Sequence, residues 1–147
     1  MNKSKNHIYY NIKKDEIENN IYRCFFRKRV IMKVKDLIRI LDAEVLCCED
    51  FLDQETKDFG ACDLLSDILA YSKDEYVLLT GLTSSQVVRT AELTGAIAIV
   101  FVRGKLPPQE AIGLAKSHHI PLLKTDNLMF TSCRKIVEEF IKEEKNK

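Results

Sequence analysis

Three short segments of the 147-residue chain carry the residues best suited to hold an anion. The first combines Thr80, Gly81, Thr83, Ser84 and Ser85. Hydroxyl groups and a glycine that allows close backbone approach suit a phosphate or carboxylate, especially where a helix begins directly after them. Capping of that helix by Thr83 or Ser84 explains the same residues without a ligand, so both interpretations stay open.

The other two segments supply a cation and further hydrogen-bonding side chains. Arg103, in the segment Val102–Pro107, could complement an anion, although a solvated turn residue is the simpler interpretation. Thr125, Asp126 and Asn127 could bind a ribose or base, but Asp126 or Asn127 would also serve as the N-cap of a following helix. We take these residues together as one candidate ligand-binding set and predict no catalytic residue.

Other residues with chemical potential do not form a site in the sequence. Asp58, Asp63 and Asp67 are better explained as solvated acids or helix caps than as ligands of a divalent cation. His118 and His119 have no second His or Cys at ligand spacing, so we predict no metal and no cofactor. The phosphate-binding, dinucleotide-binding and serine-nucleophile motifs GxxxxGK[ST], GxGxxG and GxSxG are absent.

The five cysteines form neither a CxxC pair nor an even disulfide framework, which is typical of reduced thiols in a cytoplasmic protein. Cys47 and Cys48 are adjacent in an expected strand, where successive side chains face opposite sides. We therefore expect one of them in the core and one exposed, with a redox switch as the alternative. Neither a secretory signal nor an apolar run of about eighteen residues is present, so we expect no membrane segment.

Composition and charge divide the chain near residue 31. The whole sequence is 46% hydrophobic with a net charge of +1, as in a globular protein of one domain. Residues 1–31 carry eight Lys or Arg against three Asp or Glu, whereas residues 32–147 carry fifteen against nineteen. The first segment is thus a basic arm on an acidic body, or a leader translated upstream of Met32. A basic arm can bind DNA, but the body has no helix-turn-helix pattern, so we do not expect a nucleic-acid partner.

Apolar runs and amphipathic segments alternate through the body. The spacing predicts strands at 44–47, 59–62, 76–80, 96–101 and 120–125, and helices at 34–41, 63–71, 84–94, 108–117 and from about 128 to 141. Such alternation with short connections predicts an α/β fold, a single three-layer domain with a mainly parallel sheet flanked by helices. Ligands of such sheets bind beyond the carboxyl ends of the strands, where the three candidate segments lie.

This order of elements, with Asp63-Leu64-Leu65-Ser66 after a small-residue strand and then Val77–Gly81, resembles the DRTGG domain over about residues 32–141. That domain occurs alone, beside CBS domains in regulated pyrophosphatases and transcription factors, and inside long phosphotransacetylases, and it is similar to the N-terminal domain of HPr kinase/phosphorylase. The loop corresponding to the motif that names the family, Leu52–Ala61, lacks Arg-Thr-Gly-Gly. Residues 142–147 then form a charged tail.

The resemblance implies an accessory regulatory module that dimerises and has no catalysis of its own. We therefore predict a cytoplasmic homodimer that senses a small anionic or nucleotide-like metabolite or docks a protein partner. The alternatives are a subunit of an enzyme acting on phosphate metabolites and a DNA-binding regulator that uses the basic arm.

Overall fold

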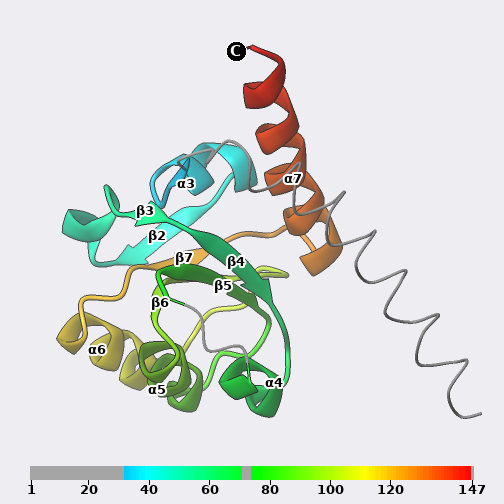
Figure 1. Cartoon of the computed structure of the whole chain (residues 1–147). Coiled ribbons are helices and arrows are strands. Elements are labelled where there is room, and N and C mark those ends of the chain that lie inside the picture. Colours follow the sequence, from blue (N-terminus) through cyan, green and yellow to red (C-terminus); the bar gives the residue numbers. More distant parts are fainter. Residues whose placement is uncertain (1–31, 71–73, 147) are drawn as a thin grey trace, which may run out of the picture. The chain divides into compact units, whose positions relative to one another are not determined.

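A computed structural model describes residues 32–70 and 74–146, built around a five-stranded sheet (Figure 1). The strand order is β2-β7-β6-β5-β4, with β2 antiparallel to β7 and the other neighbours parallel. The bounds are β2 Glu44–Cys47, β4 Asp58–Ala61, β5 Tyr76–Thr80, β6 Ala96–Phe101 and β7 Leu122–Lys124. A smaller antiparallel sheet joins β1, Met32–Lys33, to β3, Glu55–Thr56.

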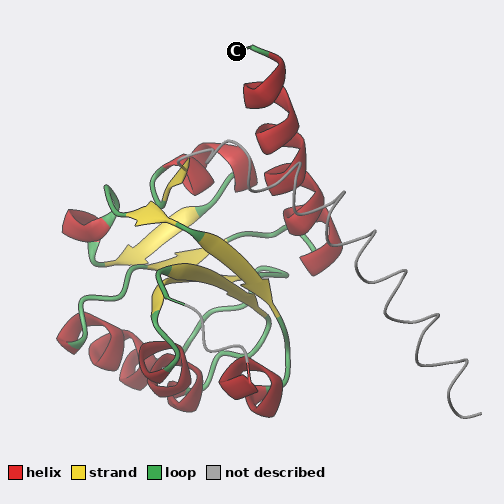
Figure 2. Cartoon of the chain, in the orientation of Figure 1, coloured by secondary structure: helices red, strands yellow, loops and turns green. Residues whose placement is uncertain are grey.

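Helices cover both faces of the larger sheet (Figure 2). One face carries α4, Leu65–Ala70, α5, Ser85–Leu93, and α6, Gln109–Ser117; the other carries α3, Asp36–Leu41, and α7, Met129–Lys145. A short 3-10 turn, η2, spans Glu49–Phe51. All described residues belong to one compact unit, so the predicted single three-layer α/β domain with a mainly parallel sheet is confirmed.

The interior strand β5, between β6 and β4, shows why the buried strands appear in the sequence as continuous apolar runs. All five of its residues are buried. Tyr76 and Leu78 pack with α4, α5 and α6, while Val77 and Leu79 pack with α3 and α7. Since successive side chains of a strand point to opposite faces, a strand covered on both sides must be apolar at every position.

The predicted elements are found with small shifts at their ends. The strand expected at 120–125 pairs only over Leu122–Lys124, and the helix expected from Pro108 begins at Gln109 with Pro108 as its N-cap. α7 continues through Lys145, into the segment that composition sets apart as a tail. The predictions for residues 1–31 lie outside the described residues. None of the described helices combines the length and the apolar character needed to cross a lipid bilayer.

Candidate functional site

The loops that follow β5, β6 and β7 lie side by side at the carboxyl edge of the parallel strands. The backbone N–H of Val102 donates to the carbonyl of Thr80 at 3.0 Å. The N–H groups of Arg103 and Gly104 donate to the carbonyls of Asn127 and Thr125, both at 2.9 Å. The three candidate segments are therefore neighbours in space, as the rule for parallel sheets requires.

A carboxylate from a fourth loop ties two of these segments together. Asp63 follows β4, and its Oδ1 accepts hydrogen bonds from the backbone N–H of Gly81 at 2.5 Å and from Thr80 Oγ1 at 3.4 Å. Its Oδ2 accepts from Arg103 Nη2 at 3.2 Å. We call these four residues the Asp63–Arg103 cluster. Sequence reasoning assigned Asp63 to a cap or to solvent, although the strand-end rule that selected the other loops also covers the end of β4.

The Arg103 guanidinium lies directly against Gly81. A Cβ atom built on Gly81 would lie 1.8 Å from Arg103 Nη2, so no larger residue fits beneath the side chain in its present position. Arg103 itself has a φ of 62°, in the left-handed region. It is an exposed turn residue, as expected, and in addition it forms an ion pair with Asp63.

The Asp63–Arg103 pair is accessible to solvent. The Asp63 side chain is 42% exposed and the Arg103 side chain 40%. An exposed ion pair of this kind contributes about 1 kcal/mol or less to the free energy of unfolding. A dissolved anion can therefore compete with the Asp63 carboxylate for the guanidinium at small cost.

Thr125 and Asn127 form a second cluster with a different environment, which we call the Leu41 tether. The Thr125 hydroxyl and the Asn127 Nδ2 both donate to the Leu41 carbonyl at 2.6 Å. Thr125 Oγ1 also accepts from Asn127 N at 3.2 Å and from Asn127 Nδ2 at 2.8 Å. Thr125 is 1% exposed. These bonds use the Thr125 hydroxyl and the Asn127 Nδ2 to hold the end of α3.

The expected capping of the last helix by Asp126 or Asn127 is wrong. α7 begins at Met129 with Leu128 at its N-cap, and no side-chain hydrogen bond caps it. Asn127 is held by the Leu41 tether instead. The Asp126 side chain is 88% exposed, with Lys124 Nζ 3.9 Å from its Oδ1.

The hydroxyl residues before α5 are positioned as the sequence predicts, but the expected capping bond is not formed. Ser84 is the N-cap residue of α5, and its side chain makes no capping hydrogen bond. Ser84 is exposed, whereas Thr83 and Ser85 are half-buried. The Thr80 hydroxyl oxygen instead accepts from the N–H of Leu82 at 3.1 Å. The Ser84 hydroxyl is thus open to solvent at the positive end of a nine-residue helix.

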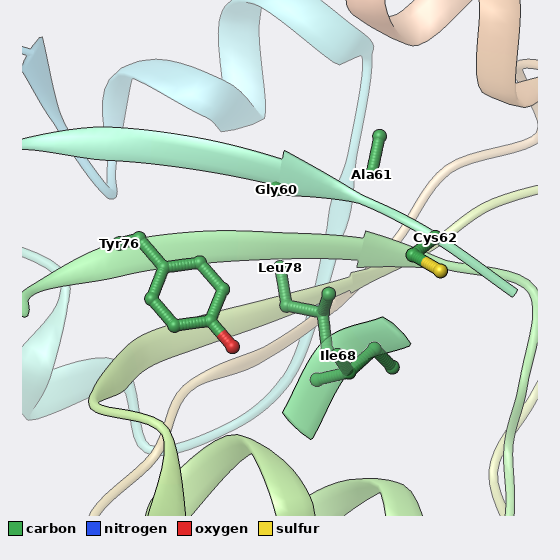
Figure 3. A pocket seen from close by; sticks show the side chains of 6 residues that line it. All are labelled: Gly60, Ala61, Cys62, Ile68, Tyr76 and Leu78. Atoms are coloured by element: carbon green, nitrogen blue, oxygen red, sulfur yellow. The ribbon is translucent and has the colours of Figure 1, made fainter. Parts of the chain in front are cut away.

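A small recess lies between β4, β5 and α4 (Figure 3). Small and apolar residues form its walls: Gly60, Ala61, Cys62, Ile68, Tyr76 and Leu78. The recess has room for about one water molecule, so a metabolite does not fit inside it. A ligand at this edge would have to bind against the loops themselves.

Contrary to the sequence prediction, the two adjacent cysteines do not lie on opposite sides of the strand. Cys47 is buried and Cys48 half-buried, but both sulfurs face the side of the sheet that carries α6: Cys47 Sγ lies 4.0 Å from the Ile120 carbonyl, just after α6, and Cys48 Sγ lies 3.8 Å from the carbonyl of Ala115 in α6. They share a side because Cys48 leaves the strand with a φ of 63°. Burial, with Cys47 beside it, raises the pKa of Cys48 to about 11, which disfavours the reactive thiolate. Among the described residues, no three His, Cys, Asp or Glu side chains gather into a metal site.

Comparison with known proteins identifies the fold. No family model matches the chain, and no curated protein matches it. One similar solved structure contains the CBS and DRTGG domains of the regulatory region of a Clostridium perfringens pyrophosphatase, crystallised with its activator diadenosine tetraphosphate. The likeness has a TM-score of 0.58 at 15% identity and covers 89% of this chain and 68% of that one. The chain therefore shares its fold with about two thirds of this CBS–DRTGG region, and the likeness to DRTGG domains that the sequence predicts is confirmed as a likeness of fold.

Proposed function

We propose that this chain is a non-catalytic regulatory module that dimerises and binds a small anionic or nucleotide-like metabolite at the carboxyl edge of its parallel strands. The observation that carries the proposal is the Asp63–Arg103 cluster. There a guanidinium and a backbone N–H converge on a carboxylate that is accessible to solvent. A phosphate oxygen accepts the same hydrogen bonds as that carboxylate.

The surroundings of the cluster favour the same class of ligand. The exposed N-terminus of α5 provides partial positive charge and the Ser84 hydroxyl within one loop of Gly81. The similar pyrophosphatase region is regulatory and was solved with a polyphosphate nucleotide. Both observations support a metabolite that carries one or more phosphate groups.

The first experiment is a thermal-shift and calorimetric titration of the full chain with pyrophosphate, ATP and diadenosine tetraphosphate. A ligand at one hundred times its Kd adds about 2.7 kcal/mol to the free energy of unfolding. In a protein of this size that raises Tm by roughly 5–10 °C. Arg103→Gln should weaken binding about 10- to 100-fold, because it removes a charge-assisted hydrogen bond.

Arg89→Gln is the matched control, since Arg89 is an exposed arginine in the middle of α5. The proposed site is wrong if both variants bind as tightly as the wild type. The ligand-sensing function is wrong if none of the three phosphate compounds binds the wild-type chain.

A further inference from the structure

α7 carries an exposed apolar stripe that nothing in the described part of the chain covers. Its inner side packs into the core through Met129, Cys133, Ile136 and Phe140. Phe130, Val137 and Ile141 are nevertheless 79%, 39% and 47% exposed. In Figure 1 the C-terminal end of α7 extends past the sheet. Exposed apolar residues that gather on one helix face are typical of an interaction surface.

The spacing of the stripe is that of a helix-pairing face. Phe130, Arg134, Val137 and Ile141 follow one another at intervals of four, three and four residues. At 3.6 residues per turn these four positions lie within about 60° of one another around the helix. Intervals of four and three residues are those of helices that pack along their length.

The same series of intervals fits a second copy of the helix as the partner. The intervals of four, three and four residues are the same when the helix is followed in the opposite direction. Two antiparallel copies of α7 can therefore pair with Phe130 of each copy opposite Ile141 of the other. The two central positions, Arg134 and Val137, then face each other. Each Arg134 also comes within reach of the Glu138 carboxylate of the other copy. In the single chain Arg134 already pairs with Glu138 four residues on, so the stripe carries both charges of a self-complementary pair.

We propose that two copies of this chain associate through antiparallel packing of their α7 helices along the Phe130–Ile141 stripe. The exposed Leu128, directly before the helix, extends the apolar surface toward the loops. This inference rests on the dimerisation in the proposed function and names the surface responsible. It is an isologous contact, the commonest kind in homodimers, because the same patch serves both copies.

The test is the mass of the full chain by light scattering and sedimentation equilibrium. Wild type should be a dimer, and Val137→Lys should raise the dimer Kd at least about 30-fold, because it places a second cation opposite each Arg134 at the centre of the contact. Leu93→Lys is the matched control, since Leu93 is a 75% exposed apolar residue at the end of α5. Because both substituted side chains are exposed to solvent, we expect both variants to keep the fold. Circular dichroism checks this.

Charge exchange provides a second, independent readout. Arg134→Glu should weaken the dimer by juxtaposing like charges, and Arg134→Glu combined with Glu138→Arg should restore it. A monomeric wild type would overturn both this surface and the dimerisation. A wild-type dimer that Val137→Lys leaves intact would overturn the α7 surface alone, most directly if removing residues 1–31 then dissociates it.

Discussion

Two polar clusters at the same edge of the sheet use similar side chains in different ways. The Leu41 tether is built from Thr125, 1% exposed, and Asn127, and both donate to one backbone carbonyl. In the Asp63–Arg103 cluster, the Asp63 and Arg103 side chains are about two-fifths exposed and pair with each other. Buried hydrogen bonds are costly to break, whereas an exposed ion pair is not. The difference indicates that the tether stabilises the fold, and it agrees with our proposal that the exposed cluster binds the ligand.

The largest expected effect lies in the tether. Thr125→Val keeps the shape of the side chain but removes the hydroxyl that donates to the Leu41 carbonyl and accepts from Asn127. A buried donor left without its partner costs about 1–3 kcal/mol, so we expect the free energy of unfolding to fall by about 2 kcal/mol in urea titrations. Binding of pyrophosphate to the folded protein should not change. Thr125→Ser retains the hydroxyl, so its free energy of unfolding should fall by about half as much or less. An equal fall in both variants would contradict a stabilising role of the hydroxyl.

Gly81→Ala should have the opposite effects: little change in stability but weaker binding of pyrophosphate. The added Cβ displaces the end of the flexible Arg103 side chain rather than backbone, so we expect less than about 1 kcal/mol of lost stability. Because Arg103 can no longer lie over the Gly81 N–H, affinity for pyrophosphate should fall about tenfold, measured by calorimetry. Gly113→Ala is the control: a Cβ there meets no atom within 4 Å, and an exposed helical position gains stability from alanine. If Gly81→Ala lowers the free energy of unfolding by more than about 2 kcal/mol, the Asp63–Arg103 cluster stabilises the fold as the Leu41 tether does.

Asp63→Asn should strengthen the binding of pyrophosphate. The amide oxygen still accepts the Gly81 N–H, but the charge that holds Arg103 is gone. Since the exposed pair is worth about 0.5–1 kcal/mol, the affinity for pyrophosphate should rise about two- to fivefold. Weaker binding would show that Asp63 contacts the ligand, rather than competing with it for Arg103.

The sequence predicts the fold more fully than the candidate site, and the reason is physical. Apolar runs such as Tyr76–Thr80 indicate a strand covered on both faces because burial acts on every residue of the run. The roles of Thr125 and Asn127 depend on the position of the Leu41 carbonyl, more than eighty residues away in the chain. The pairing of Asp63 with Arg103 likewise spans forty residues. Local patterns identify polar residues at strand ends, but only the tertiary structure decides which of them the fold itself uses.

Ser84→Ala should have the smallest effect, and its size separates two explanations of the same residue. A serine whose side chain caps a helix contributes about 0.5–2 kcal/mol, but Ser84 makes no such bond, so we expect its removal to cost less than 0.5 kcal/mol in thermal and urea unfolding. A larger loss would mean that capping alone accounts for a hydroxyl at this position. Unchanged stability together with weaker pyrophosphate binding would place the hydroxyl with Arg103 in the ligand site, since the fold would then have no use for it.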